Sequence, residues 1–148
     1  MNRTFKGRPV IPGSIRGETL VSSEGVNPLA AWKDAAIRKS KTALCSDQNN
    51  KDLYNKRLDG RVLCLPQVIG STTGGIVLAT AAHLNIGPAA LLFADHIDSL
   101  AASGVIISDT WVGNRIVTID RLGREFLDFV SDGMTVDITH DGTVTVYA

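Results

Sequence analysis

Residues 61–75, RVLCLPQVIGSTTGG, carry the pattern from which the fold follows. Arg61–Pro66 is a short, mostly apolar run, which predicts a buried strand. The small-residue run Gly70–Gly75 predicts a turn, and Ile76–Asn85 predicts a helix that ends before Gly87-Pro88. A strand, a glycine-rich turn and a helix in succession are typical of α/β proteins, in which ligands bind at the carboxyl ends of the strands.

The residues that follow repeat this alternation. Ala89–Ala94 predicts a second buried strand, His96–Ser103 a short helix closed by Gly104, and Val105–Ser108 a third strand. Apolar strands that alternate with helices indicate a sheet that is mostly parallel, with right-handed crossovers. The fold class is therefore expected to be α/β.

Both ends of the chain are expected to add β elements to this centre. Residues 8–23 contain a turn signal between two β-leaning stretches, which predicts a short hairpin or two paired strands. Arg115–Asp120 predicts a strand, and Arg124–Val130 a short helix or a strand. Met134–Tyr147 predicts a hairpin that turns at Asp141-Gly142.

A helix is predicted at Leu29–Arg38, and residues 46–60, SDQNNKDLYNKRLDG, are expected to form an exposed loop. Residues 1–148 have the length of one ordinary domain, so we expect a single domain.

Charge and composition exclude several classes of protein. Fifteen basic residues balance fifteen acidic ones, so neither a nucleic-acid partner nor an anionic membrane surface is expected. The first thirteen residues lack the apolar stretch of a signal peptide, and no segment has the ~18 apolar residues of a membrane span. Two cysteines are too few for a disulfide scaffold. These features predict a cytoplasmic protein.

Three adjacent hydroxyls, Ser71, Thr72 and Thr73, precede the helix that begins at residue 76. Helix capping is the first interpretation, because Ser and Thr are preferred caps. The alternative is that a hydroxyl acts as a base or holds an anion at the positive end of the helix dipole. Gly70, Gly74 and Gly75 are expected to let a ligand approach the backbone. The run is neither a Walker A motif nor GxGxxG, which disfavours nucleotide binding.

Four motifs together resemble the aconitase X swivel domain. They are the strand Gly60–Pro66, the loop Gly70–Gly74, the strand start Gly87–Ala90, and the opening Gly7–Ser22. The resemblance covers most of the chain in order. It implies a swivelling β/β/α domain, a central mostly parallel sheet with flanking β elements, that packs against a larger catalytic domain, either fused or on a separate chain.

The resemblance also implies a function. The chain would be the small subunit of a hydro-lyase heterodimer, inactive alone, whose larger subunit holds an iron–sulfur cluster or an iron site. Ser71 would be the base that removes a proton next to a carboxylate, and Gly70, Thr72, Thr73 and Gly74 would bind the substrate. No metal is expected in this chain. The family's substrates are cis-3-hydroxy-L-proline, which we expect here, and phosphomevalonate.

The chain departs from the family between residues 27 and 50. The family's S-F-W-G-G-V-D-P-x-T-G stretch is here NPLAAWKDAAIRKSKTALCSDQNN, in which only Pro28-Leu29 and Trp32 correspond. This departure affects the expected substrate and not the fold. Two other functions stay open: a non-catalytic swivel domain that binds an anionic ligand or a protein, and a phosphotransfer swivel domain. The second is disfavoured because Gly70–Gly75 has no histidine.

Other chemically capable side chains have structural interpretations. Cys64 is expected to be an inert core thiol, whereas Cys45, in the polar region, is a candidate reactive thiol. The histidines show no metal-site spacing, and Arg8 and Arg16 are expected on the surface or at an interface. Trp32 and Trp111 are equally compatible with core packing and with an interface. The histidines are His83, His96 and His140.

Overall fold

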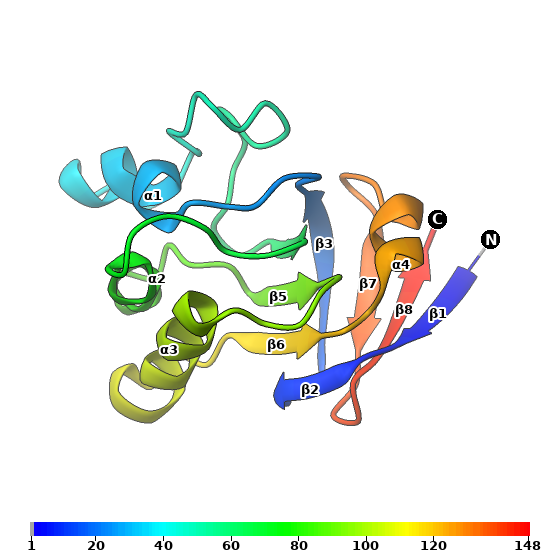
Figure 1. The fold of residues 1–148 in the computed structure, drawn as a ribbon. Coiled ribbons are helices and arrows are strands. Elements are labelled where there is room, and N and C mark those ends of the chain that lie inside the picture. Colours follow the sequence, from blue (N-terminus) through cyan, green and yellow to red (C-terminus); the bar gives the residue numbers. More distant parts are fainter. Residues whose placement is uncertain (1) are drawn as a thin grey trace.

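The computed structural model describes residues 2–148 (Figure 1). The strands are β1 (Asn2–Lys6), β2 (Arg8–Ile11), β3 (Ile15–Val21), β4 (Val62–Leu65), β5 (Ala90–Phe93), β6 (Val117–Asp120), β7 (Thr135–Ile138) and β8 (Thr143–Tyr147). The helices are α1 (Pro28–Ile37), α2 (Gly74–His83), α3 (Ser99–Ile107) and α4 (Arg124–Phe129), and α3 continues into the π-helical turn η1 (Ser108–Val112).

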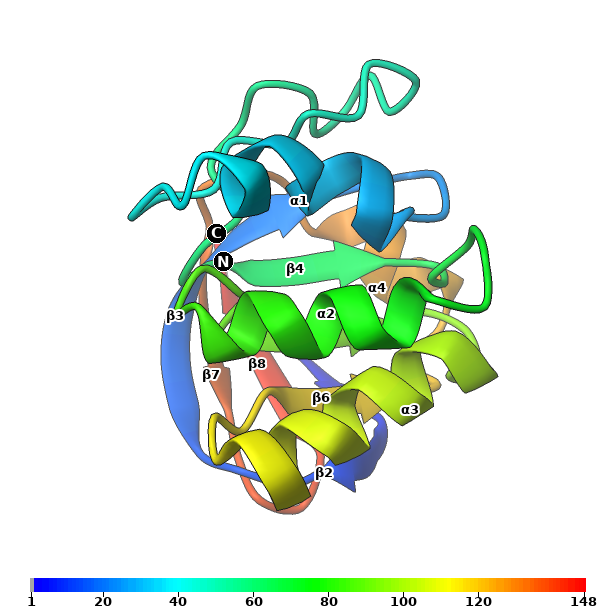
Figure 2. The same ribbon diagram turned by 90° about the vertical axis from the view of Figure 1, so that its left-hand side faces the viewer.

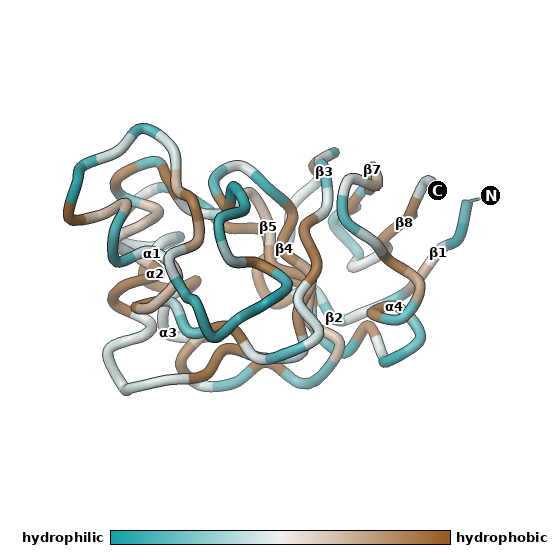
Figure 3. Tube along the Cα trace, turned by 90° about the horizontal axis from the view of Figure 1, so that it is seen from above, coloured by the Kyte–Doolittle hydropathy of each residue, from teal (hydrophilic) through white to brown (hydrophobic). Residues whose placement is uncertain are grey.

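Strands β4 and β5 form the centre of the molecule because every residue in them is apolar and buried. Successive side chains of a strand point to opposite faces, so the strands supply two separate cores. Leu63, Leu65, Leu91 and Phe93 belong to the cluster that includes the helices. Their neighbours Val62, Cys64, Ala90 and Leu92 belong to the cluster on the other face. Figure 3 shows the hydrophobic character of the chain along β4 and β5.

All eight strands are joined in the order β1-β8-β7-β3-β4-β5-β6-β2. The pairs β3–β4, β4–β5 and β5–β6 are parallel, and every other pair is antiparallel. Strand β3 serves both parts, because Ile15–Glu18 pairs with β7 while Thr19–Val21 pairs with β4. The expected α/β class, with a mostly parallel centre and β elements from both ends, is confirmed.

Helices α1, α2 and α3 lie side by side on one face of the parallel strands (Figure 2). Trp32 of α1 is buried, and its indole N–H donates to the Ile86 carbonyl oxygen at 2.8 Å. Between α2 and α3 there is no room for a side chain at Gly75. A Cβ there would overlap Ser103 Oγ and lie 2.8 Å from the Leu100 carbonyl oxygen. Gly75 therefore serves close helix packing.

Two sequence expectations about strands are wrong. The stretches within residues 8–23 are strands, but β2 pairs with β6, and β3 pairs with β7 and β4, so they do not form a hairpin with each other. Residues 105–108 continue α3 and enter η1 instead of forming a strand. Their β-branched side chains favour a strand locally, but packing of this segment against α2 overrides that weak propensity.

The segment between α1 and β4 is only partly exposed, contrary to the expectation for residues 46–60. Leu53 and Leu58 are buried in the helix-side core. Buried polar side chains satisfy the loop backbone: Asp59 Oδ1 accepts from the Ala43 N–H at 2.8 Å, and Asn50 Oδ1 accepts from the Leu53 N–H at 3.1 Å. This segment is therefore an irregular but anchored part of the fold.

The remaining expected elements are confirmed, with small shifts of their ends, except that Gly104, expected to close the helix at 96–103, lies within α3. The expected helix at 29–38 is α1, the strands at 61–66, 89–94 and 115–120 are β4, β5 and β6, and the hairpin at 134–147 is β7 and β8. Of the two forms expected at 124–130, the structure has the helix α4. In the described part of the chain, no helix combines the length and apolarity that a membrane crossing requires.

Gly75→Ala should lower the free energy of unfolding by about 2 kcal/mol, because the added methyl group forces α2 away from α3. Urea unfolding followed by circular dichroism measures the change. Gly74→Ala is the matched control in the same helix, since its Cβ would make only ordinary contacts, 3.6 Å or more from Pro28. A neutral Gly75→Ala variant would contradict the proposed role of this glycine.

Candidate functional site

The loop between β4 and α2 lies at the carboxyl end of β4, as the sequence predicts. It is held in place by its neighbours on two sides. The Ile69 N–H donates to the Val26 carbonyl oxygen at 2.8 Å, and the Val26 N–H donates to the Gln67 carbonyl oxygen at 3.0 Å. The first half of the loop is therefore paired like a short parallel strand with the segment that leads to α1.

Asp98 fixes the same loop from the other side. One of its carboxylate oxygens accepts from the Val68 N–H at 2.9 Å, and the other accepts from the Ala101 N–H at 3.0 Å as the N-cap of α3. One carboxylate thus joins the loop to the start of α3. Asp98 is not among the residues expected from the sequence, although Asp is a preferred N-cap and places the start of α3 at Ser99.

Gly70 marks the point where the loop turns. Its φ is +114°, a backbone conformation that residues other than glycine rarely adopt. A Cβ at this position would lie 3.0 Å from the Asn27 side chain. Asn27 Oδ1 in turn accepts from the Ala30 N–H at 3.3 Å and caps α1. The start of α1 therefore lies against the loop that leads to α2.

The three hydroxyl residues Ser71, Thr72 and Thr73 are all exposed. Ser71 Oγ and Thr73 Oγ1 lie 2.6 Å apart and share a hydrogen bond. Thr73 occupies the N-cap position of α2, but its side chain caps no backbone N–H, so the expected capping role of this hydroxyl is wrong. The two hydroxyls therefore contact each other and solvent.

Gly74 and Gly75 do not offer open backbone to a ligand in the way Gly70 does. Both are buried. The Gly74 N–H already donates to the Ser71 carbonyl oxygen at 3.0 Å, and Gly75 is pressed against α3. An α-helix nevertheless leaves the N–H groups of its first turn without intrahelical partners, and α2 has no acidic residue there to neutralise its dipole. The start of α2, where the neighbouring residues Thr73 and Ile76 are exposed, can therefore attract an anion.

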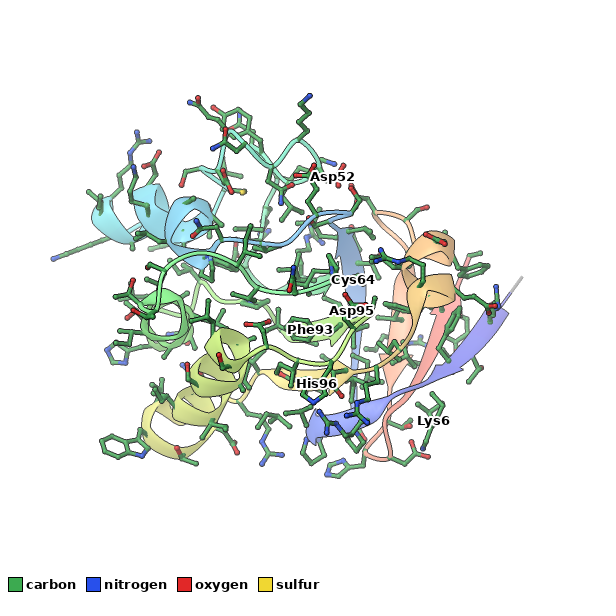
Figure 4. The ribbon with its side chains drawn as sticks, in the orientation of Figure 1. Lys6, Asp52, Cys64, Phe93, Asp95 and His96 are labelled. Atoms are coloured by element: carbon green, nitrogen blue, oxygen red, sulfur yellow. The ribbon has the colours of Figure 1, made fainter. Side chains whose placement is uncertain are left out.

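The end of β5 contributes a second group of polar residues to this edge of the sheet (Figure 4). Asp95 and His96 follow β5, and His96 Nδ1 donates to the Ile97 carbonyl oxygen at 2.7 Å. His96 Nε2 lies 3.5 Å from Arg8 Nη2. The sequence interpretation of His96 as structural agrees with these contacts, and Arg8 belongs to an ion pair.

That ion pair ends on the fully buried Asp120 at the end of β6. Arg8 donates to both carboxylate oxygens, at 2.9 and 2.6 Å, and the Ile97 N–H donates to one of them at 2.8 Å. Burial raises the pKa of Asp120, but the hydrogen bonds from Arg8 and Ile97 and the Arg8 charge together hold this pKa below its ordinary value. Asp120 thereby connects β2, β6 and the segment after β5.

The other candidate residues stand apart from this edge. Cys45 and Cys64 are both buried, so the expectation that Cys45 is a reactive thiol is wrong. Among residues 2–148, no group of three His, Cys, Asp or Glu side chains is arranged to hold a metal ion. Arg16 pairs with Asp137 on the surface of β3 and β7 at 2.6 Å. Trp111 is 86% exposed.

Arg8→Met should lower the melting temperature by several degrees at pH 7, because it leaves the buried Asp120 carboxylate without its cation. The wild-type pair stabilises the fold above the unfolded pKa of about 3.9 and loses that effect as the pH falls through the lower folded pKa. In the variant, Asp120 takes up a proton more readily, so the difference should shrink in acid. Thermal melts between pH 3 and 7 measure this.

The control for this prediction is Arg16→Met, which breaks an exposed pair and should shift the melting temperature by no more than about 2 °C. Equal effects of the two substitutions would contradict the role assigned to Asp120.

Both thiols should be inert in the folded protein. Burial raises the pKa of Cys45 and that of Cys64, which disfavours the reactive thiolate. A chromogenic disulfide reagent should label neither cysteine within minutes at pH 8. It should label both cysteines in about 8 M urea, which unfolds small domains. One rapidly labelled thiol without urea would show that the region around Cys45 opens.

Two relatives resemble this chain over most of its length. The phosphomevalonate dehydratase small subunit of Methanosarcina mazei is 29% identical over 132 residues, which are 89% of this chain and 82% of the relative. The protein of the same name from Methanothermobacter thermautotrophicus is 28% identical over 134 residues, 90% of this chain and 92% of the relative.

A solved structure and a family model cover nearly the whole chain. The crystal structure of Thermococcus kodakaraensis aconitase X in its holo-form superposes with a TM-score of 0.82 over 99% of both chains, at 24% identity, and so shares the fold. The model of the aconitase X swivel domain matches residues 4–146. This chain therefore belongs to the aconitase X swivel domain family.

Proposed function

We propose that this chain is the small subunit of an aconitase X-type hydro-lyase and that Ser71 is the base that removes a proton from the substrate. The observation that carries the proposal is the hydroxyl pair of Ser71 and Thr73, 2.6 Å apart, on the exposed loop before α2. The dehydratase small-subunit names of the two relatives support the class of reaction.

The loop has the properties that such a base requires. A serine hydroxyl removes a proton only when its deprotonated form is stabilised. Thr73 can donate a hydrogen bond to a Ser71 oxygen that carries negative charge, and the start of α2 adds the positive end of its dipole. Both effects are weak in water and grow when a partner closes over the loop.

Substrate binding is proposed for the backbone and hydroxyls around the base. Gly70, Thr72 and Thr73 flank Ser71 in the sequence and are exposed. Gly74 is buried and its N–H already donates to the Ser71 carbonyl oxygen, so it shapes the loop and does not contact the substrate. An anionic group of the substrate would face the start of α2 while the carbon that loses its proton faces Ser71 Oγ. In the elimination, the deprotonated Ser71 Oγ takes the proton from carbon, the C–H electron pair becomes the new carbon–carbon double bond, and the hydroxyl group leaves the neighbouring carbon as hydroxide.

The residues of this chain do not fit an iron–sulfur cluster. Ligation of a cluster requires several thiolates close together. Cys45 and Cys64 lie in different hydrophobic cores. We therefore propose that an iron–sulfur cluster or iron site belongs to the larger subunit, and that this chain contributes only the base and contacts to the substrate anion. Alone, the chain would be inactive.

Cis-3-hydroxy-L-proline is the substrate that we propose, on the resemblance of the motifs. Phosphomevalonate is the necessary comparison, since the relatives are named for it. Both carry a carboxylate, a negatively charged group that the start of α2 favours. The segment of residues 27–50, which departs from the family pattern, approaches the loop at Asn27 and is the part of this chain that can distinguish the two.

Ser71→Ala should lower kcat by ~100-fold or more in the assembled enzyme, the size expected for a lost acid–base group. The chain would be co-expressed without oxygen with the larger subunit of its dehydratase, and dehydration of both substrates would be assayed. Because Ser71 is exposed, the variant should fold and assemble as the wild type does.

Ser99→Ala is the control, since Ser99 is another exposed serine in the first turn of the neighbouring helix α3. Full activity of the Ser71→Ala complex would overturn the assignment of the base and leave a binding module. Failure of the wild-type chain to form any complex would overturn the subunit assignment itself.

A further inference from the structure

Asp98 is the side chain that holds the backbone of the loop before Ser71. Among the hydrogen bonds of residues 2–148, it is the only side chain bonded to the backbone of residues 66–73, through the Val68 N–H at 2.9 Å. Its second carboxylate oxygen accepts from the Ala101 N–H at 3.0 Å and caps α3. Because both oxygens have a partner, the carboxylate cannot turn without breaking one of these hydrogen bonds.

The main chain that carries Asp98 is itself fixed. The neighbouring Ile97 N–H donates to the fully buried Asp120 at 2.8 Å, and His96 Nδ1 donates to the Ile97 carbonyl oxygen at 2.7 Å. Asp120 is paired with Arg8. The segment before α3 is therefore tied to β6 and β2, and Asp98 is a firm support for the loop.

The chain on the other side of Ser71 rests on the same helix. Gly75 packs so closely on α3 that a Cβ there would overlap Ser103 Oγ and lie 2.8 Å from the Leu100 carbonyl oxygen. Val68 precedes Ser71 by three residues, and Gly75 follows it by four. Both of these points are held by α3, one through a hydrogen bond and the other through packing. Helix α3 thus determines where the chain between them lies.

We infer that Asp98 is a positioning residue for Ser71, an inference that rests on the proposed function. Among the described residues, the exposed Ser71 hydroxyl bonds only to Thr73, so the loop backbone sets where its oxygen lies. By holding Val68, Asp98 holds that backbone. A shift of about 1 Å in a reacting group can lower a rate on the order of 100-fold. In this scheme Asp98 acts through Ser71 and does not contact the substrate.

The inference is tested with Asp98→Ser in the assembled enzyme. Serine is itself a preferred N-cap, so α3 keeps its cap, whereas one short hydroxyl cannot also accept from the Val68 N–H. The kcat of the folded complex should fall roughly 10- to 100-fold, because the base is displaced. KM should change less than about threefold, because the substrate contacts around Ser71 remain. Circular dichroism gives the folded fraction by which kcat is corrected.

A double-mutant cycle with Ser71→Ala distinguishes positioning from a general structural role. If Asp98 acts through Ser71, then Asp98→Ser should lower kcat less than about threefold further in a complex that already lacks the Ser71 hydroxyl, since residues that act as a unit are not additive. A residue that only supports the fold would lower kcat by the same factor in both backgrounds.

Asp141→Ser is the matched control. The Asp141 carboxylate also holds a backbone N–H, that of Thr143 at 3.1 Å, but it lies in the turn between β7 and β8, whose Gly142 bonds to Gly7 and not to the Ser71 loop. This variant should keep the wild-type kcat. If Asp98→Ser melts far below the wild type, Asp98→Asn replaces it in the same cycle, because an amide has one oxygen and cannot accept both hydrogen bonds.

The outcomes separate this inference from the proposed function. An unchanged kcat for the Asp98 variant, or an equal loss with and without the Ser71 hydroxyl, overturns the inference and leaves Ser71 as the base. An equal loss in Asp141→Ser also overturns it. Full activity of Ser71→Ala alone overturns the proposed base, and the positioning role falls with it.

Discussion

Strand β3 is the constraint on which the architecture depends, because it is shared between two kinds of sheet. Its first four residues hydrogen-bond to the antiparallel strand β7, and its last three hydrogen-bond to the parallel strand β4. Strand β3 lies between β7 and β4 in the sheet, and a Cβ at Gly17 would collide with the Val62 side chain, so the close approach of β4 requires a glycine there. The position of β3 fixes β4, and β4 fixes the loop that carries Ser71. The candidate site is thus placed by backbone pairing and not by its own side chains.

The central α/β alternation could be predicted from the sequence because its strands are short, continuously apolar and bounded by glycine or proline. The predictions that were wrong concern segments whose structure depends on partners far along the chain. Residues 105–108 have the local character of a strand, and only the close packing of α3 on α2 at Gly75 and Gly104 makes them helical. Likewise the two stretches within residues 8–23 have the character of strands, but their partners β4, β6 and β7 lie far along the chain, as the pairs Thr19–Val62 and Ile15–Ile138 show.

For the candidate site, the sequence indicated the loop but not what holds it. The glycines and hydroxyls of residues 70–75 are adjacent in the sequence, whereas Asp98 and Asp120 accept hydrogen bonds from groups far along the chain, from Val68 and from Arg8 respectively. Only the geometry also separates the glycines by role: Gly70 adopts a backbone conformation that few other residues can, and Gly75 makes room for a helix. The Thr73 hydroxyl, expected as a cap, is instead the partner of Ser71.

The two ends of the chain have a consequence for how such a domain can be connected to others. Strand β1 pairs with β8 so that Asn2 lies opposite Tyr147, and both termini emerge together on the side away from α1, α2 and α3 (Figure 1). A linker attached at either end therefore leaves the helices and the Ser71 loop unobstructed, and joining the ends to each other requires only a short bridge. The same fold can therefore serve as a separate subunit, as a domain at either end of a longer polypeptide, or as a circular permutant.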